Sequence, residues 1–356
     1  MNCRHPWKFA LRSSSGAMAA DPCGFARRHA RRALVALFGL LAVLSWPFVK
    51  WAWADRGVRP VTVPVDDTWC NDPRAPPKPG MYGPSMSAKL SNVPVIEPPL
   101  AQLLFNQALM QEFAFNQVES RRNFDHVVKL NPQCALCWWG AARSRSSNIN
   151  HNVKDFAKFN ELALQAKEVL RPEDGPKVAR LVHSLQLLRV PNATGSGSDQ
   201  WAEVNQTRFK LAEYLCARPA DADLKALCAD ALMAATPWNY YVQGDLKPHL
   251  REAWDHLRAL VSPRRAPHVL ALHLLIHLAE PQGGGQDRTL IGQLAADALD
   301  GMVRGSGHLD HMAAHIYQQV GRYTAGIRAS RRAREDNDAY LKNCLVPYCM
   351  GHNLHL

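Results

Sequence analysis

Hydrophobic and polar residues recur with a helical period between positions 100 and 345. Apolar residues return at intervals of three and four over successive segments of about 12–18 residues. No run shows the alternation that is typical of a strand. The pattern predicts an all-α domain over residues 100–356, broken by turns at Asn131-Pro132, residues 171–175 and 191–198, Pro219, Thr236-Pro237, Ser262-Pro263 and residues 281–285.

Two stretches have the character of paired antiparallel helices. Residues 103–132 form one pair and end at a proline. Residues 312–335 form the other, with small residues and an aromatic at the expected places: Gly321, Tyr323, Gly326 and Ala333. In tetratricopeptide repeats, small residues let two helices approach and an aromatic fills the space beside them. We therefore expect a tetratricopeptide-like solenoid or a bundle of antiparallel helix pairs.

A separate hydrophobic run lies near the N-terminus. Residues 33–49 carry no charge and follow a basic cluster at residues 27–32. The run suits either a short membrane-spanning helix or a long signal-peptide core. Since basic clusters tend to stay in the cytoplasm, it predicts a single-pass type II anchor with a lumenal or extracytoplasmic domain. Ala52-Trp53-Ala54 also fits a signal-peptidase site, so secretion after cleavage stays open, as does organelle import.

The charge of the chain agrees with this topology. The net charge is +11 and 47% of the residues are hydrophobic, enough for a sizeable core and too many for a disordered chain. Residues 1–54 hold eight Lys and Arg and one Asp, so they account for +7 and leave +4 for the other 302 residues. Most of the excess positive charge thus lies beside the hydrophobic run, where it is explained by membrane orientation. Because the rest of the chain has only a small excess, we do not expect nucleic-acid binding.

The chain divides into four parts. A basic segment, residues 1–32, precedes the anchor or signal sequence at residues 33–54. Residues 55–99 are rich in proline, which prevents regular helix, and read as a linker or strap. Residues 100–356 form the helical domain. Acceptor triplets for N-glycosylation begin at Asn192 and Asn205 and agree with a lumenal location.

Histidine carries the candidate chemistry. Seven of the 15 His residues form three short clusters, spaced i, i+4, then i, i+3, i+7, then i, i+3, so that each lies on one helix face. Imidazoles from adjacent helices can converge on a transition metal, with copper, zinc or iron as the cofactors expected. Partly buried, hydrogen-bonded helix faces are the alternative. The metal-ligand candidates are His273, His277, His308, His311, His315, His352 and His355.

Glu280 follows the first cluster by three residues and is the candidate catalytic residue, as a metal ligand, an orienting group or a general base. The pattern is not that of a zinc protease, which needs Glu directly after the first His, where Leu274 stands here. The glycines at residues 283–285 lack the Lys and Ser or Thr of a phosphate loop. Peptide hydrolysis and nucleotide use are therefore not expected.

Two further patterns allow several interpretations. Cys134 and Cys137 form a lone CxxC, which we interpret as a disulfide at a helix start or as two buried small side chains. Cys344 and Cys349 bridge each other or stay free, and Cys70 can tether the strap. The amides of the repeated Phe-Asn-Gln tripeptides and of a nearby Asn group line a polar pocket or cap helices; these are Asn106, Gln107, Asn116, Gln117, Asn148, Asn150 and Asn152.

Six motifs in a fixed order resemble a family of exported bacterial tetratricopeptide-repeat-like proteins with His-rich C-terminal motifs. They are FNQALMQEFAFNQVES, NPQCALCWWGAARSRSSNIN, ADALMAATPWNYY, HLLIHLAE, GHLDHMAAHIYQQVGRY and HNLHL, and they cover roughly residues 100–356. The seven candidate His residues stand where the family pattern has His. Gln117 replaces a His of that pattern, Leu272 an Asn, and Ala313-Ala314 a Pro-Ser.

We therefore expect a membrane-anchored or exported helical-repeat protein with a His-rich transition-metal site. As an enzyme, it would carry out metal-dependent oxidation or hydrolysis. The competing hypothesis is a non-catalytic scaffold that holds a protein segment or a small molecule in its helical groove, with the membrane contacted through residues 33–49.

Overall fold

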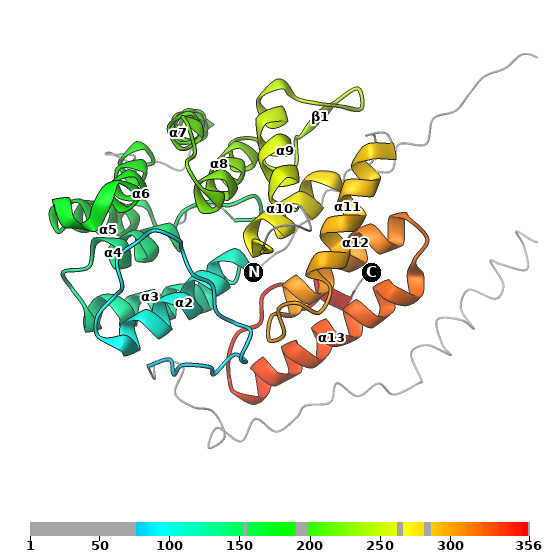
Figure 1. The fold of residues 1–356 in the computed structure, drawn as a ribbon, viewed down its shortest axis with the longest axis horizontal. Coiled ribbons are helices and arrows are strands. Elements are labelled where there is room, and N and C mark those ends of the chain that lie inside the picture. Colours follow the sequence, from blue (N-terminus) through cyan, green and yellow to red (C-terminus); the bar gives the residue numbers. More distant parts are fainter. Residues whose placement is uncertain (1–75, 152–154, 190–197, 262–265, 281–285, 355–356) are drawn as a thin grey trace, which may run out of the picture. The chain divides into compact units, whose positions relative to one another are not determined.

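The computed structural model describes residues 76–151, 155–189, 198–261, 266–280 and 286–354, without the side chains of residues 198–205, 286 and 287. The predicted all-α class is confirmed (Figure 1). The α-helices of the described residues are α2 (Pro99–Phe113), α3 (Gln117–Leu130), α4 (Ala135–Arg143), α5 (Phe156–Glu168), α6 (Gly175–Leu187), α7 (Ser198–Cys216), α8 (Ala222–Ala235), α9 (Pro248–Leu260), α10 (Val269–Ala279), α11 (Gln286–Leu299), α12 (Gly307–Gln319) and α13 (Tyr323–Lys342). Two short 3-10 helices are η2 (Pro172–Asp174) and η3 (His352–Leu354).

Local signals explain where several helices begin. Asp155, Asp221 and Ser306 each accept a hydrogen bond from the backbone N–H three residues on, at 2.9, 3.0 and 3.3 Å, and so cap α5, α8 and α12. Proline occupies the first turn of α2, α6 and α9, where its missing N–H costs nothing. These are residue types that the sequence shows directly.

Consecutive helices pack as antiparallel pairs, and α12 with α13 shows how. Gly326 of α13 lies against α12, where an added Cβ would meet Ala314 and Tyr317 at 3.8 Å. Ala333 is fully buried, and its carbonyl lies next to Gly307. The small residues thus act as predicted. The aromatic does not, because Tyr323 is 65% exposed and Tyr317 is the buried ring.

The pair α2 and α3 packs through aromatic rings and continues onto α4. Phe105 of α2 meets Phe124 of α3 edge to face, with ring centroids 5.4 Å apart. Gly140 of α4 sits directly on Phe124, where an added Cβ would lie 2.2 Å from the ring. A glycine is therefore required for α4 to approach α3 this closely.

The described residues also contain a small hairpin that the helical pattern did not predict. Strands β1 (Tyr241–Val242) and β2 (Asp245–Leu246) pair in antiparallel register. Gln243 and Gly244, between them, both have positive φ, at 51° and 89°. Two consecutive positive φ angles suit a tight two-residue hairpin turn. Strands of two residues are too short to produce a readable alternation.

Residues 76–98, in the proline-rich region, contain no helix or strand and lie on the helices. Tyr82 donates a hydrogen bond to Glu119 of α3 at 2.6 Å. The backbone N–H and the hydroxyl of Ser91 both donate to Asp223 of α8 at 2.7 Å. Contacts of this kind connect the segment to helices that are far apart along the chain.

Helix α10 occupies the centre of the described domain. It packs against α2, α8, α9, α11 and α12 (Figure 1). Every residue from Val269 to Leu278 is buried. A helix that is buried on all sides has no polar face, which explains its uniformly apolar sequence apart from two His residues.

The structure does not test the predicted membrane segment or the two predicted glycosylation sites. The hydrophobic run at residues 33–49 and the triplet at Asn192 lie outside the described residues. Asn205 lies in α7, where its side chain is not described. Within the described ranges, no helix has both the length and the apolar character that crossing a membrane requires.

Candidate metal centre

Helix α10 contributes two His residues to the interior. His273 and His277 are 0% and 1% exposed and lie one helical turn apart. His273 places its Nδ1 2.7 Å from the backbone oxygen of Phe113, at the end of α2. Because a carbonyl oxygen can only accept, His273 donates through Nδ1 and its Nε2 carries the lone pair in the neutral ring.

Helix α12 contributes three more. His308, His311 and His315 are all buried on the face that packs toward α10 and η3. The i, i+3, i+7 spacing therefore places the side chains on one face, as predicted. His352 of η3 is partly buried and completes the set from the C-terminal end.

Six of these rings form two separate groups. Cluster A consists of His273, His277 and His308, and cluster B of His311, His315 and His352. Within each cluster, one possible ligand atom per residue lies within 4.8 Å of the others. The His clusters of the sequence thus come together in space, but in a different grouping. His308 lies with the two His residues of α10, whereas His311 and His315 of the same helix lie with His352 of η3. His355, the seventh predicted ligand, lies outside the described residues.

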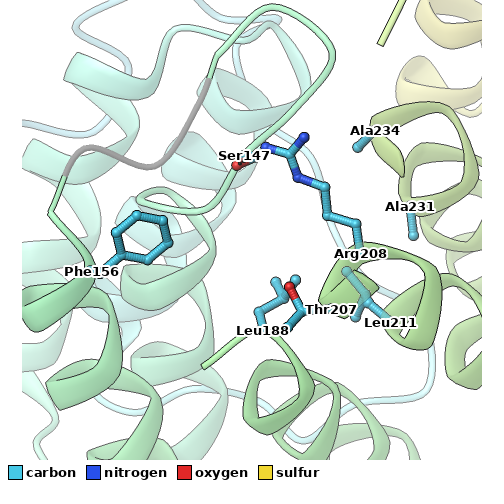
Figure 2. Close-up of a pocket in the computed structure, with 8 residues that line it drawn as sticks. All are labelled: Ser147, Phe156, Leu188, Thr207, Arg208, Leu211, Ala231 and Ala234. Carbon is cyan, nitrogen blue, oxygen red and sulfur yellow. Dashed lines mark hydrogen bonds between the residues drawn. The ribbon is translucent and has the colours of Figure 1, made fainter. Parts of the chain in front are cut away.

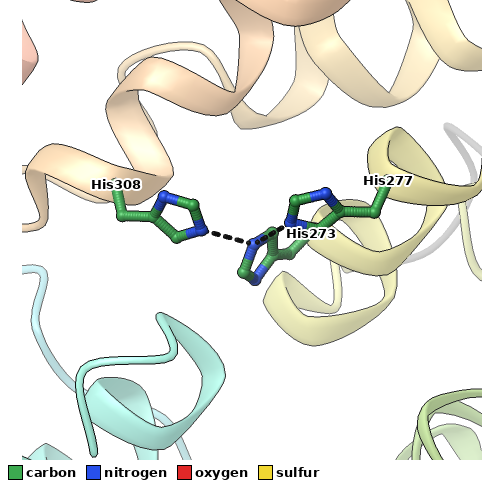
Figure 3. A group of neighbouring side chains, drawn as sticks. All are labelled: His273, His277 and His308. Atoms are coloured by element: carbon green, nitrogen blue, oxygen red, sulfur yellow. Dashed lines mark hydrogen bonds between the residues drawn. The ribbon is translucent and has the colours of Figure 1, made fainter. Parts of the chain in front are cut away.

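Cluster A brings three Nε2 atoms together (Figure 3). The Nε2 of His273 lies 3.1 Å from the Nε2 of His308 and 3.1 Å from the Nε2 of His277. His273 has one lone pair there, and one lone pair cannot accept two hydrogen bonds well. A cation at the point where the three rings meet can bind all three nitrogens at once.

Cluster B has a similar arrangement. His315 places its Nδ1 2.7 Å from a carboxylate oxygen of Glu280 and its Nε2 3.1 Å from the Nε2 of His352. The ring of His311 lies 4.7 and 4.8 Å from the rings of these two residues, centroid to centroid. His311 is fully buried, and neither of its ring nitrogens has a hydrogen-bond partner among the described residues. A buried polar atom of this kind requires a partner.

Glu280 lies between the two clusters. It caps the C-terminus of α10 and is 3% exposed. One carboxylate oxygen is 2.7 Å from Nδ1 of His315, and the other is 3.8 Å from Nδ1 of His277. A carboxylate on Nδ1 leaves Nε2 to bind a metal and fixes the orientation of the ring. Of the three roles predicted for Glu280, this geometry suits the orienting group.

Aromatic rings enclose cluster A. Phe115 lies against all three of its rings, with centroids 4.3–6.1 Å away. Trp238 meets His277 edge to face at 5.2 Å, and Tyr348 meets His308 at 4.9 Å. Phe115 has a positive φ of 58°, which is unusual for a bulky residue and turns its ring inward. Sequence reasoning missed these residues, since an aromatic beside a His cluster gives no signal along the chain.

The ring separations fit a metal. A zinc–nitrogen distance of about 2.0–2.1 Å places two nitrogens of a tetrahedral ion about 3.3–3.4 Å apart. The 3.1 Å separations of His273 from His277 and His308 are close to this value. Imidazole suits copper, zinc and iron, so the donor set fits the predicted cofactors without choosing among them.

Burial keeps His273, His308 and His311 neutral, which is the form that binds metal. It lowers the pKa of His273, His308 and His311 well below the usual value for histidine, and neighbouring His residues add to the effect. Burial opposes ionisation of Glu280, but His315 and His277 outweigh it and hold the pKa of Glu280 well below its usual value. The site therefore contains three neutral donors, two in cluster A and one in cluster B, and one carboxylate.

The amides make local hydrogen bonds and cap helices, which is the second of the two interpretations. The side chains bind separate parts of the chain instead of converging: Gln107 bonds to Gly80 and Asn123, Asn116 caps α3, and Asn150 accepts from Trp238. Gln117, which replaces a His of the family pattern, donates to the backbone of Ser146 at 3.4 Å. Asn152 lies outside the described residues.

The six cysteines of the described residues are in disulfides, whereas Cys70, the predicted tether of the strap, lies outside them. Cys134 and Cys137 form one at the start of α4, which is the first of the two predicted alternatives. Cys216 and Cys228 form another between α7 and α8, which was not predicted. Cys344 and Cys349 are also disulfide-bonded, so neither is free. Cys216 and Cys228 lie near Glu252, but sulfurs in a disulfide are not thiolate ligands.

A pocket between the loop before α5 and helices α6, α7 and α8 is a separate feature (Figure 2). It is mainly apolar, and Arg208 crosses it to donate to the hydroxyl of Ser147 at 2.8 Å. None of the His residues of clusters A and B lines it. The pocket therefore has no part in the metal centre.

No protein-family model, curated protein or solved structure matches the chain.

Proposed function

We propose that the protein binds transition-metal ions through clusters A and B. The observation that carries the proposal is the position of His273. Its Nδ1 donates to a backbone carbonyl, so its Nε2 lone pair faces two other ring nitrogens at 3.1 Å in a fully buried site. A metal ion binds all three nitrogens, whereas a network of hydrogen bonds leaves one of them poorly paired.

The ligand number supports chemistry at the metal. Three protein ligands leave one coordination position of an ion open, which is typical of catalytic metal sites. A structural site usually fills all four positions with protein ligands. Oxidation or hydrolysis at a bound metal is therefore the class of reaction that we propose if the protein is an enzyme.

The disulfides support an exported domain. Cys134–Cys137 and Cys216–Cys228 both lie in the helical domain. Disulfides persist in oxidising compartments and are rare in the cytosol. We therefore keep the proposal that residues 33–49 anchor the chain or direct its export, with the helical domain in the lumen or outside the cytoplasm. We also propose that the chain is related to the exported bacterial tetratricopeptide-repeat-like proteins that its motifs resemble.

The scaffold is the second function that we consider. Leu290 and Leu294 are 57% and 46% exposed and lie one turn apart on α11. Exposed apolar side chains on a helix face can bind a protein segment. A pure scaffold needs no metal, so metal binding discriminates between the two functions.

The test is metal analysis of the full-length chain, purified in detergent and exposed in turn to copper, zinc and iron. We expect the protein to retain at least one of these metals after dialysis. The double variant His273→Ala, His311→Ala removes one ligand from each cluster and is expected to lose most of it. Elemental mass spectrometry gives the ratio of metal to protein.

His183→Ala is the matched control, because His183 is an exposed histidine of α6. It is expected to bind as much metal as the unchanged chain. If the unchanged chain retains no metal, or if the folded double variant retains the same amount, the proposal is wrong and the scaffold is favoured. Circular dichroism shows whether the double variant is folded.

A further inference from the structure

The spacing along α12 limits what a single ion can bind. His308 and His315 are seven residues apart, which is about 10 Å along a helix axis. Two nitrogens on one ion lie at most about 4.2 Å apart, because each is about 2.1 Å from the metal. The six nitrogens accordingly form two groups rather than one. His308 and His315 therefore belong to different groups.

The two clusters are nevertheless in contact. The rings of His308 and His352 have centroids 6.3 Å apart, and those of His277 and His315 are 6.4 Å apart. Each of these pairs joins a member of cluster A to a member of cluster B. Ions bound to the two clusters would therefore be neighbours within one buried site.

Glu280 connects the clusters chemically. It places one carboxylate oxygen against His315 of cluster B and the other against His277 of cluster A. The contact with His315, at 2.7 Å, is short enough to orient that ring, and the contact with His277, at 3.8 Å, is an ion-pair distance. Removing the Glu280 carboxylate would therefore disturb His277 of cluster A and His315 of cluster B together, as expected if the two clusters form one centre.

Charge indicates which metal suits such a pair. Imidazoles bound to a metal supply no negative charge, and the described residues place one carboxylate, Glu280, against these rings. Two divalent ions would bring four positive charges into a buried site, whereas two copper(I) ions would bring two. Since burying uncompensated charge is costly, the monovalent pair is the more stable one. Copper also accepts imidazole ligands readily.

We infer that the His centre is dinuclear, with one ion on each cluster, and that copper(I) is the ion it takes. The inference rests on the proposed metal binding and adds to it the number of ions, two, and their identity, copper(I). Paired metal ions are used by several classes of enzyme.

The experiment counts copper in the full-length chain under anaerobic conditions. The protein is titrated with copper(I) against a chromophoric copper(I) chelator, and bound copper is measured at saturation. We expect two copper ions per chain. His273→Ala and His311→Ala are each expected to bind one ion, and His183→Ala two.

The outcomes separate this inference from the function it rests on. Saturation at one ion overturns the pair but leaves metal binding intact, and no bound ion overturns both. A folded single variant that still binds two ions also overturns the assignment of one ion per cluster. Zinc that displaces copper at equal concentration overturns the choice of metal.

Discussion

Among single residues, Glu280 has contacts that could not be predicted from the residues next to it in the sequence. It ends α10, yet its carboxylate is buried against a His of α12 as well as one of its own helix. A buried carboxylate is stable only when it is paired, and here the partners are two imidazoles that each turn the other nitrogen toward a cluster.

Replacing this carboxylate with an amide tests its role. Glu280→Gln keeps the size of the side chain but loses the charge and one acceptor. We expect the metal affinity to fall by about tenfold to a hundredfold, since partners that orient metal-bound His have effects of that size. Competition with a chromophoric chelator measures the affinity.

Glu252→Gln is the control for this variant. Glu252 also lies beside a histidine, His256, at 3.5 Å, but on the exposed side of α9. The metal affinity should be unchanged in this control. An unchanged affinity in folded Glu280→Gln would mean that the carboxylate does not orient the ligands.

At the scale of helices, small residues set how closely neighbours pack, but not all to the same degree. Gly140 leaves no room for a side chain against Phe124, with 2.2 Å to the nearest ring atom. Gly326 leaves ordinary van der Waals space, at 3.8 Å. The sequence contains both glycines but does not reveal this difference, because the distance depends on the facing helix.

The two glycines predict opposite results. Gly140→Ala should lower the free energy of unfolding by about 1–3 kcal/mol, because the new methyl overpacks the interface of α3 and α4. Gly326→Ala should leave it unchanged or raise it by about 0.4–1 kcal/mol, because alanine restricts the unfolded chain. Urea denaturation measures both, and equal effects at the two sites would contradict the packing described.

At the scale of the whole described domain, Asp223 joins parts that are distant in sequence. Its carboxylate accepts hydrogen bonds from Ser91 of the 76–98 segment and from Lys177 of α6, and it lies 3.1 Å from His268 at the start of α10. Burial opposes its ionisation, but His268 and Lys177 outweigh it and hold the pKa of Asp223 well below the usual value.

The sign of this shift gives a pH dependence. A lowered pKa in the fold contributes stability above about pH 4, the value for an unfolded aspartate, and the contribution disappears as the pH falls through the folded value. Asp223→Asn should therefore lower the free energy of unfolding by about 3 kcal/mol at pH 7. The difference from the unchanged chain should shrink below pH 4.

Denaturation curves at several pH values test this prediction. Asp255→Asn is the control, because its pair with Arg258 is largely exposed and should be worth less than about 0.5 kcal/mol. A difference for Asp223→Asn that stays constant from pH 7 to pH 3 would show that the stabilisation does not come from the ionised carboxylate.

Much of the helical architecture could be predicted from local pattern. The helices around His273 and His315, the caps at Asp221 and Ser306, and the turn at Gly321 all follow from residues within a few positions of one another. The hairpin at residues 241–246 was missed because two-residue strands have no period. The repeat pattern predicts Tyr323 as the buried aromatic, but Tyr317 is the one that the packing of α12 and α13 buries.

The helical class of the domain and the shared helix faces of the His residues can both be predicted from the sequence, because both depend on a period of 3.6 residues. Which His residues meet depends on how the helices pack. The packing brings His308 to the His residues of α10, brings His311 and His315 to η3, and places Glu280 between the two groups. A helix period fixes the direction of a side chain around its own axis, whereas the partner across an interface depends on how separate helices pack.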